Sequence, residues 1–179
     1  PAGEGWGGLS VQHALTRSVR DSAALLDAVC IPQPGDPYWL DPPATPFLEE
    51  VSKPPGKLRI AYTTSTLIWG EAEPDPAQAV RNAVKLCASL GHDIEEARPD
   101  VDFQAMAVHA NTLVTCSVAA TLKRESERRG ATVKREEVEH LTWSLAEAAA
   151  KVDGVTAAIA LQSLHALARQ LAAFFETYD

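Results

Sequence analysis

Eight of the twelve prolines lie in one stretch, between Pro32 and Pro55. Proline fixes φ and lacks a backbone N–H, so it interrupts helices and is excluded from central strands. The runs "QPGDP" and "DPPATP" within this stretch are typical of turns and extended surface chain. We therefore expect residues 32–56 to form a surface crossover, with room for one short helix around Phe47–Val51.

One helix is predicted before this crossover, within segment 1–31. Ser18 is suited to cap its first turn, and apolar residues then recur at helical spacing from Val19 to Val29. Pro32 ends the helix because its ring cannot continue the hydrogen-bond ladder.

Segment 57–100 has the pattern of a strand, a helix and a second strand. Lys57–Thr63 carries enough β-branched and aromatic residues for a short strand. In "DPAQAVRNAVKLCASLG", Asp75 suits a helix cap, Pro76 fits the first helical position and Gly91 ends the helix. The run "HDIEEARP" then predicts the second strand of a βαβ-like unit.

Segment 101–179 is predicted to be helical. One long helix starts near Asp102 and runs towards Gly130, and a second carries apolar residues from Val138 to Val152. A third spans Thr156 to Tyr178. The fold class is therefore α/β and helix-dominated, with a small mixed sheet of two or three strands and about five helices.

Composition excludes several functions. Acidic residues outnumber basic ones, which gives a formal net charge of −8, and no basic run is longer than a pair, so we expect no nucleic-acid partner. Cys30, Cys87 and Cys116 are too few and too widely spaced for a disulfide framework, which suits a cytoplasmic protein. The longest uncharged run, Phe103–Leu122, contains polar side chains, so we do not expect it to enter a membrane.

Ser10 and His13 are the residues that could indicate a serine hydrolase. The nucleophile elbow requires G-x-S-x-G, whereas the run here is "GLSVQ", without the second glycine. A structural role for both residues is therefore the favoured interpretation.

Glu137 and His140 have the spacing of half a carboxylate-bridged metal site. The second half would have to be Gln162 and His165, which supply no carboxylate. The chain also contains no Walker loop and no G-x-G-x-x-G run. We therefore predict neither a metal nor a cofactor.

Arg17 and Asp21 are four residues apart at the start of the first predicted helix. Opposite charges at this spacing form surface pairs worth a few tenths of a kcal/mol. We predict a structural role for this pair.

The uncharged run Phe103–Leu122 is unusual in a chain in which 22% of residues are charged. A surface helix normally carries charge on its outer face. Burial against other parts of the protein is the favoured interpretation, and the wall of a small-molecule cleft is the alternative. If it lines a cleft, Cys116 and Asn111 are the candidate substrate-pocket residues.

The stretch "GEGWGGLSVQHALTRSVRDSAALLDAV" resembles the amidase signature family, in which a "TRSV.D.A.LLDA" helix follows the catalytic core. Later runs occur in the same order as in that family. "PGKLRIAYTT" is similar to its "LRIG" strand, "VRNAVKLCASLGHDIEEARP" to its helix–strand unit, and "LHALARQLAAFFETYD" to a helix that precedes a further strand. The resemblance covers essentially the whole chain.

The resemblance implies an enzyme that hydrolyses carboxylic amides with a Ser–cis-Ser–Lys triad and an oxyanion hole of backbone N–H groups. The chain contains no Ser-Ser pair and no Gly-Gly-Ser run, so we assign it no catalytic residue. We expect those elements to lie before Pro1, and 1–179 to be a single partial domain of the family's fold. The expected partners are a small amide substrate in the full-length enzyme and further copies of the chain.

Two other interpretations stay open at this point. The chain could be a non-catalytic α/β scaffold or binding fragment, which would retain no hydrolytic chemistry. It could also be a self-standing enzyme that uses Ser10 and His13. An assay of the isolated chain distinguishes them, because only a self-standing enzyme would hydrolyse a substrate without further residues.

Overall fold

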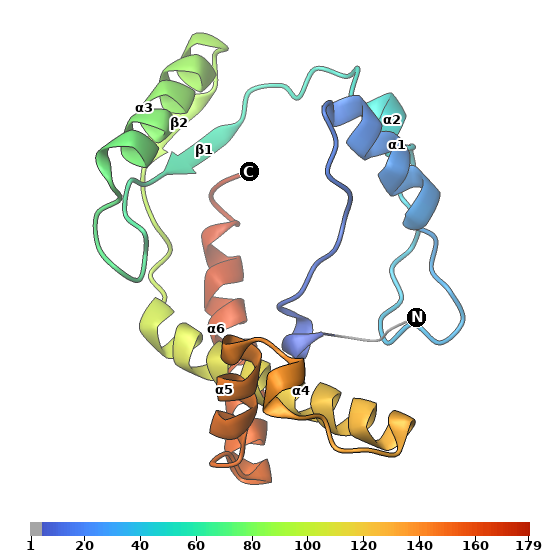
Figure 1. Cartoon of the computed structure of the whole chain (residues 1–179). Helices are drawn as coiled ribbons and strands as arrows, with labels where there is room; N and C mark the ends of the chain where they lie inside the picture. Colours follow the sequence, from blue (N-terminus) through green and yellow to red (C-terminus); the bar gives the residue numbers. More distant parts are fainter. Residues whose placement is uncertain (1–4) are drawn as a thin grey trace. The chain divides into compact units, whose positions relative to one another are not determined.

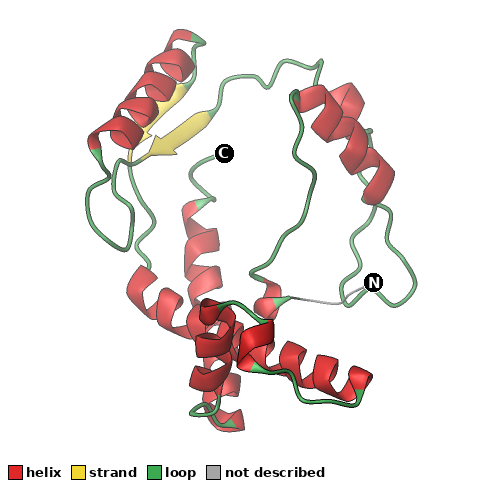
Figure 2. Ribbon diagram, in the orientation of Figure 1, coloured by secondary structure: helices red, strands yellow, loops and turns green. Residues whose placement is uncertain are grey.

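A computed structural model describes residues 5–179 and divides the chain into two compact units, one ending at Gly56 and one beginning at Lys57. The division falls at the end of the proline-rich crossover. The opening residues 1–4, including the start of the stretch that resembles the amidase signature family, lie outside the described residues. Helices account for most of the regular structure, as Figure 2 shows.

The first unit contains the short 3-10 helix η1 (Trp6–Gly8), α1 (Val19–Val29) and α2 (Phe47–Glu50). Ser18 caps α1 as predicted, because its Oγ accepts a hydrogen bond from the Asp21 backbone N–H at 3.1 Å. α2 confirms the short helix expected around Phe47.

A carboxylate of α1 fixes the start of α2. The two oxygens of Asp27 accept hydrogen bonds from the backbone N–H groups of Phe47, at 2.7 Å, and Leu48, at 2.9 Å. These N–H groups have no partner inside their own helix, so a carboxylate there acts as a cap. The proline-rich crossover is therefore closed onto the helix that precedes it.

In the second unit, β1 (Arg59–Tyr62), α3 (Pro74–Ser89) and β2 (Asp93–Glu96) form the predicted βαβ unit. The two strands pair in parallel, with Ile60 opposite Ile94. The sheet is parallel over residues 5–179, which corrects the expectation of a mixed sheet. Figure 1 shows α3 alongside the two strands.

α3 begins earlier than the sequence predicts. Glu73 occupies the N-cap position and Pro74 the first turn, so Asp75 is inside the helix and is not its cap. A first-turn proline is tolerated because its missing N–H would have had no helical partner. Gln78 Nε2 donates a hydrogen bond to Asn82 Oδ1 at 2.9 Å on the helix surface.

A tight loop between β1 and α3 was not foreseen from the sequence. Ser65 and Glu71 form an antiparallel bridge, and the Thr66 N–H donates to the Gly70 carbonyl at 2.7 Å. At the tip Leu67 adopts φ +68°, in the left-handed region that costs a non-glycine residue roughly 1–2 kcal/mol.

The remaining elements are α4 (Phe103–Arg129), the 3-10 turn η2 (Arg135–Glu137), α5 (His140–Ala149) and α6 (Gly154–Phe174). α4 contacts both α5 and α6, and Figure 1 shows the three helices crossing. Its ends are as predicted, because the Asp102 side chain caps the start and Gly130, at φ +66°, ends it. α5 is shorter at both ends than its apolar pattern suggests, because Val138 is extended and a turn follows Ala149. α6 begins two residues before Thr156 and ends at Phe174, where a turn follows.

Few residues of the described chain are buried. They are Ala23, Ala77, Thr115, Val133, Ala160 and Leu164. The exposed surface is 13182 Å², whereas two separate compact units of these lengths would expose about 10,000 Å² together. Much apolar surface on these elements therefore has no covering within residues 5–179.

Candidate functional site

The best-placed candidate site is a pocket beyond the carboxyl ends of β1 and β2. Ligands in sheets of parallel strands bind at this end, where the loops that follow the strands converge. The pocket has a volume of about 270 Å³ and is enclosed by the β1–α3 loop, the segment after β2 and the first turn of α4. Its lining residues are Leu67, Arg98, Pro99, Asp100, Val101, Asp102, Phe103 and Gln104.

Two contacts fix the walls of this pocket. The Gln104 Nε2 donates a hydrogen bond of 2.6 Å to the Ile68 carbonyl, which ties the β1–α3 loop to α4. Asp102 accepts a hydrogen bond from the Ala105 N–H at 2.9 Å, which sets where α4 begins. The Gln104 hydrogen bond thus holds the loop that carries the strained Leu67 against the first turn of α4.

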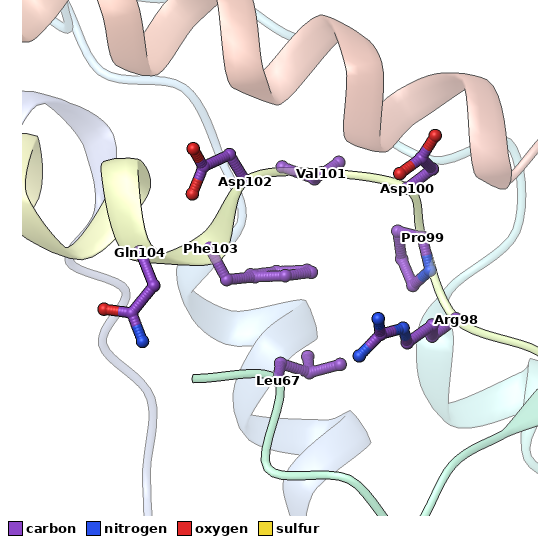
Figure 3. Close-up of a pocket in the computed structure, with 8 residues that line it drawn as sticks. All are labelled: Leu67, Arg98, Pro99, Asp100, Val101, Asp102, Phe103 and Gln104. Atoms are coloured by element: carbon purple, nitrogen blue, oxygen red, sulfur yellow. The ribbon is translucent and has the colours of Figure 1, made fainter. Parts of the chain in front are cut away.

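The side chains that line the pocket point to two different sides of the backbone. Figure 3 shows the Phe103 ring, Leu67 and the Arg98 guanidinium on one side of the connecting chain, with the Asp100 and Asp102 carboxylates directed to the other. Among residues 5–179, Arg98 forms no ion pair. The pocket could therefore hold an apolar group next to a hydrogen-bond acceptor or an anion.

Cys116 and Asn111, the predicted pocket residues, lie further along α4. Cys116 is half-buried and Asn111 is exposed. Five residues of helix rotate by about 140° beyond one turn, so the two side chains do not share a face. Cys116 is also about 20 Å along the helix from Phe103. Neither lines the pocket of Figure 3, and their contact with substrate stays a prediction.

The hydroxyl groups of the uncharged run bond mainly to their own helix. Thr112 Oγ1 donates to the Val108 carbonyl at 3.0 Å, and the buried Thr115 Oγ1 donates to the Thr112 carbonyl at 2.8 Å. Such bonds let polar side chains lie in a packed helix face without another partner. This part of α4 therefore suits packing against protein, which was the favoured interpretation of its missing charge.

Within residues 5–179, α4 is the one helix long and apolar enough, by length and composition, to cross a membrane. Core helices of soluble proteins pass the same test. The contacts of α4 with α5 and α6, together with its internal hydroxyl groups, favour packing within the protein. That it does not enter a membrane stays a prediction.

His13 does not pair with Ser10. Its Nε2 lies 2.9 Å from Ser22 Oγ and 3.2 Å from the Ser22 carbonyl. A nucleophile–base pair also requires a group that orients the base, and no carboxylate within residues 5–179 bonds to the other ring nitrogen. The contact fixes the chain before α1, which is the structural role that the sequence favours.

Glu137 is occupied by contacts that leave it unsuited to a metal. Its Oε2 accepts from the Arg129 guanidinium and from the Lys134 N–H, both at 2.6 Å. The Arg129 hydrogen bond is the main reason that the pKa of Glu137 lies below its ordinary value. No group of three or more potential metal ligands occurs in the described part of the chain.

Arg17 and Asp21 lie at the start of α1, but Arg17 precedes the cap residue and is outside the helix. Their pair is absent from the ion pairs of residues 5–179. Asp21 instead contributes its backbone N–H to the Ser18 cap.

Two further cavities lie in the second unit. One, of about 350 Å³, is bounded by β1, β2 and the segment after α6, including Arg59 and Tyr178. The other, of about 240 Å³, lies between α4 and α5 and is mainly apolar, with Val133 and Trp143 in its wall. These cavities also lack Cys116 and Asn111.

Comparison with known proteins identifies the fold that contains these features. The Amidase family model matches residues 7–179. The 6-aminohexanoate-cyclic-dimer hydrolases of Paenarthrobacter ureafaciens and Pseudomonas sp. (strain NK87) are each 29% identical to the chain over 171 residues. The alignment covers 94% of this chain and 35% of each hydrolase.

Solved structures give the same result. A structure of 6-aminohexanoate cyclic dimer hydrolase superimposes with a TM-score of 0.82 and 29% identity, over 90% of this chain and 34% of that one. The structure of that enzyme with its substrate matches equally well. The chain therefore spans about a third of the length of the curated relatives it matches.

Proposed function

The chain belongs to the amidase family, and we propose that it acts as part of an enzyme that hydrolyses small carboxylic amides to an acid and an amine or ammonia. The observation that carries the proposal is the match over nearly the whole chain, together with the preserved arrangement of its elements in a solved hydrolase. The relatives' names describe hydrolysis of a cyclic amide, which supports a small-molecule amide as the substrate class.

In this proposal residues 5–179 bind part of the substrate and support the fold of the enzyme. Groups outside these residues perform the covalent steps. A serine hydroxyl needs a base and an oxyanion hole to attack an amide carbon. We find no such set among residues 5–179, because the one Ser–His contact lacks an orienting group. Helices α3 to α6 and the β1–β2 sheet would form one part of the enzyme. The pocket at Phe103 would hold part of the small-molecule substrate.

The cytoplasm is the proposed location. Cys30, Cys87 and Cys116 are free thiols in the structure, which is compatible with a reducing compartment.

A domain exchange tests the proposal. The segment of the Paenarthrobacter ureafaciens hydrolase that aligns with this chain would be replaced by the chain, and the hybrid assayed for hydrolysis of linear and cyclic amides. We expect measurable hydrolysis, whereas a hybrid with a shuffled sequence in the same place should be inactive. A soluble, cooperatively melting hybrid without hydrolysis would favour the non-catalytic scaffold.

The isolated chain provides the complementary test. We expect it to hydrolyse no simple amide or ester above background, because the one Ser–His contact within residues 5–179 has no group that orients the base. Turnover that disappears in Ser10→Ala or His13→Ala would instead restore the interpretation of a self-standing enzyme.

The active hybrid also tests whether Cys116 of α4 faces substrate. Cys116→Trp should change KM or the order of preferred substrates if this position faces substrate, with Cys116→Ala as the control for loss of the thiol alone. Unchanged KM and preference would remove Cys116 from the substrate site.

A further inference from the structure

The pocket of Figure 3 contains one cationic side chain, that of Arg98. Among residues 5–179 its guanidinium forms neither an ion pair nor a hydrogen bond, and the side chain is exposed. Arg59, Arg128 and Arg129, by contrast, each pair with a carboxylate. The Arg98 guanidinium therefore has all its N–H donors available to a ligand in the pocket.

The backbone at Arg98 is fixed on both sides. Before it, the Ala97 N–H donates to the Tyr62 carbonyl at 3.1 Å, which continues the β1–β2 pairing beyond β2. After it, Pro99 has a fixed φ and also excludes helical backbone from the residue that precedes it. Arg98 thus begins from a set position at the end of the sheet, so a ligand need not order the backbone to reach it.

The apolar wall of the pocket is held in place as well. Phe103 and Leu67 are both half-buried. The Phe103 N–H donates to the Val101 carbonyl at 2.9 Å, and the Leu67 N–H donates to Ser65 Oγ at 3.2 Å. Leu67 keeps its φ of +68° because these surroundings hold it, and such strained residues occur most often at ligand-binding sites.

Two carboxylates of the lining limit the charge that a ligand can carry. Asp102 accepts the Ala105 N–H at the start of α4, and Figure 3 shows the Asp100 and Asp102 carboxylates directed away from Arg98 and Phe103. A ligand on the Phe103 side therefore meets the guanidinium directly. Because two carboxylates lie near one cation, a singly charged anion is favoured over phosphate, which carries more charge.

We propose that this pocket binds the carboxylate of a small aliphatic acid. The guanidinium of Arg98 holds the carboxylate, because its planar pair of N–H donors matches two carboxylate oxygens. The aliphatic chain lies against Phe103 and Leu67. The volume of about 270 Å³ suits a short chain, since pockets for drug-sized ligands begin at about 300 Å³.

The assignment of this ligand to a reaction rests on the proposed function, whereas the binding itself does not. Hydrolysis of an aliphatic amide releases an aliphatic carboxylate. An amide substrate can also carry a carboxylate at its far end. Both sources present the same chemistry to Arg98, and kinetic measurements separate them.

The first experiment titrates the full chain with sodium hexanoate and follows the Arg98 side chain and the Leu67 methyl groups by NMR. We expect both sets of signals to shift and to saturate. Hexanamide, which has the same length without charge, and hexylamine, which has the opposite charge, should each bind at least about fivefold more weakly. Acetate, which lacks the aliphatic chain, should also bind at least about fivefold more weakly.

A matched pair of variants tests the role of Arg98. Arg98→Gln should weaken hexanoate binding at least about fivefold and leave hexanamide binding unchanged. Arg81→Gln removes the same charge from the exposed surface of α3, outside the pocket, and should retain the affinity. The urea midpoints should stay equal, because the Arg98 side chain holds no other part of the chain.

Several results would overturn the proposal. Hexanoate signals that do not saturate, or equal binding of hexanoate and acetate, would show that the pocket does not recognise an aliphatic acid. Tighter binding of inorganic phosphate than of hexanoate would indicate a general anion site. Tighter binding of hexylamine would show that Asp100 and Asp102 set the charge preference. Equal losses in Arg98→Gln and Arg81→Gln would remove Arg98 from the contact.

The active hybrid identifies the source of the carboxylate. A substrate carboxylate predicts a lower KM for the monoamide of adipic acid than for hexanamide, and Arg98→Gln should remove the difference. A released acid predicts equal KM values and inhibition by hexanoate that requires Arg98. Hexanoate binding without hydrolysis by the hybrid would refute the proposed function alone, and hydrolysis without hexanoate binding would refute this site alone.

Discussion

Several carboxylates that could have served a reaction are used to hold local structure. Asp27 fixes the start of α2, and Asp102 and Asp153 cap α4 and α6. Glu137 bonds to Arg129 and to the Lys134 N–H. At the scale of single residues, these four carboxylates therefore have structural roles.

The Ser18 cap can be tested directly. Ser18→Ala leaves the Asp21 N–H without its acceptor at 3.1 Å, so we expect the first unit to lose about 1 kcal/mol of stability. Ser18→Asp, which retains an acceptor, should lose much less. Denaturant unfolding followed by circular dichroism gives both values, and equal losses would show that the hydroxyl does not act as a cap.

The carboxyl of Asp179 has a predictable titration. The hydrogen bonds that the Arg59 side chain donates hold the pKa of Asp179 below its ordinary value of 3.8. A lowered pKa in the folded state means that the attachment of Asp179 is complete above the ordinary value and weakens as the pH falls through the folded-state value. Carbon-13 NMR of the carboxyl measures this titration.

Arg59→Gln should return the titration midpoint of Asp179 towards its ordinary value. Lys57→Gln is the matched control, because Lys57 pairs with Asp93 at 2.7 Å and leaves Asp179 untouched. Equal midpoints in the two variants would contradict the role assigned to Arg59.

At the scale of elements, helix packing in the second unit is concentrated where α5 and α6 cross α4. Ala160 and Leu164 of α6 and Thr115 of α4 are the buried residues of these helices. The small side chains of Ala160 and Thr115 allow the helices to approach closely. The buried Thr115 hydroxyl is not left without a hydrogen-bond partner, because it donates to the Thr112 carbonyl within α4.

Leu164 and Leu141 provide a matched test of this packing. Leu164 is 5% exposed and Leu141 is 68% exposed. Leu164→Ala should cost about 2–5 kcal/mol of unfolding free energy, because it removes buried apolar atoms and leaves a cavity. Leu141→Ala should change stability by less than about 0.5 kcal/mol. Thermal and urea unfolding of both variants decide whether α6 packs as described.

At the scale of the whole molecule, the solvent-exposed area of 13182 Å² is larger than the roughly 10,000 Å² expected for two compact units of these lengths. The exposed large apolar residues include Val11, Leu15 and Trp69, at 93%, 105% and 83% exposure. Apolar patches larger than a few hundred Å² favour association. We therefore predict that the isolated chain forms dimers or larger oligomers.

Light scattering over a concentration series tests this prediction. We expect the average mass to rise with concentration, and more strongly at high sulfate, which strengthens apolar burial. A monomer with a cooperative melt at high micromolar concentration would show that the chain buries enough of its own surface to be stable alone.

Elements with local sequence signals were predictable. Ser18, Asp102 and Gly130 mark helix ends that the structure reproduces, because caps and left-handed ends depend on neighbouring residues only. The two strands, the crossover and the family were also predictable from composition, spacing and the order of motifs. The early start of α3 was missed because Pro74 and Pro76 both suit a first turn.

Contacts between residues that are far apart in the sequence were not predictable. The capping of α2 by Asp27 and the link from Gln104 to Ile68 each join residues from different segments. The bond of His13 to Ser22 joins residues nine positions apart across the start of α1. The meeting of Asp179 and Arg59 spans 120 positions in the chain. No spacing rule relates such residues, because their distance is set by how helices and strands pack and not by local backbone preference.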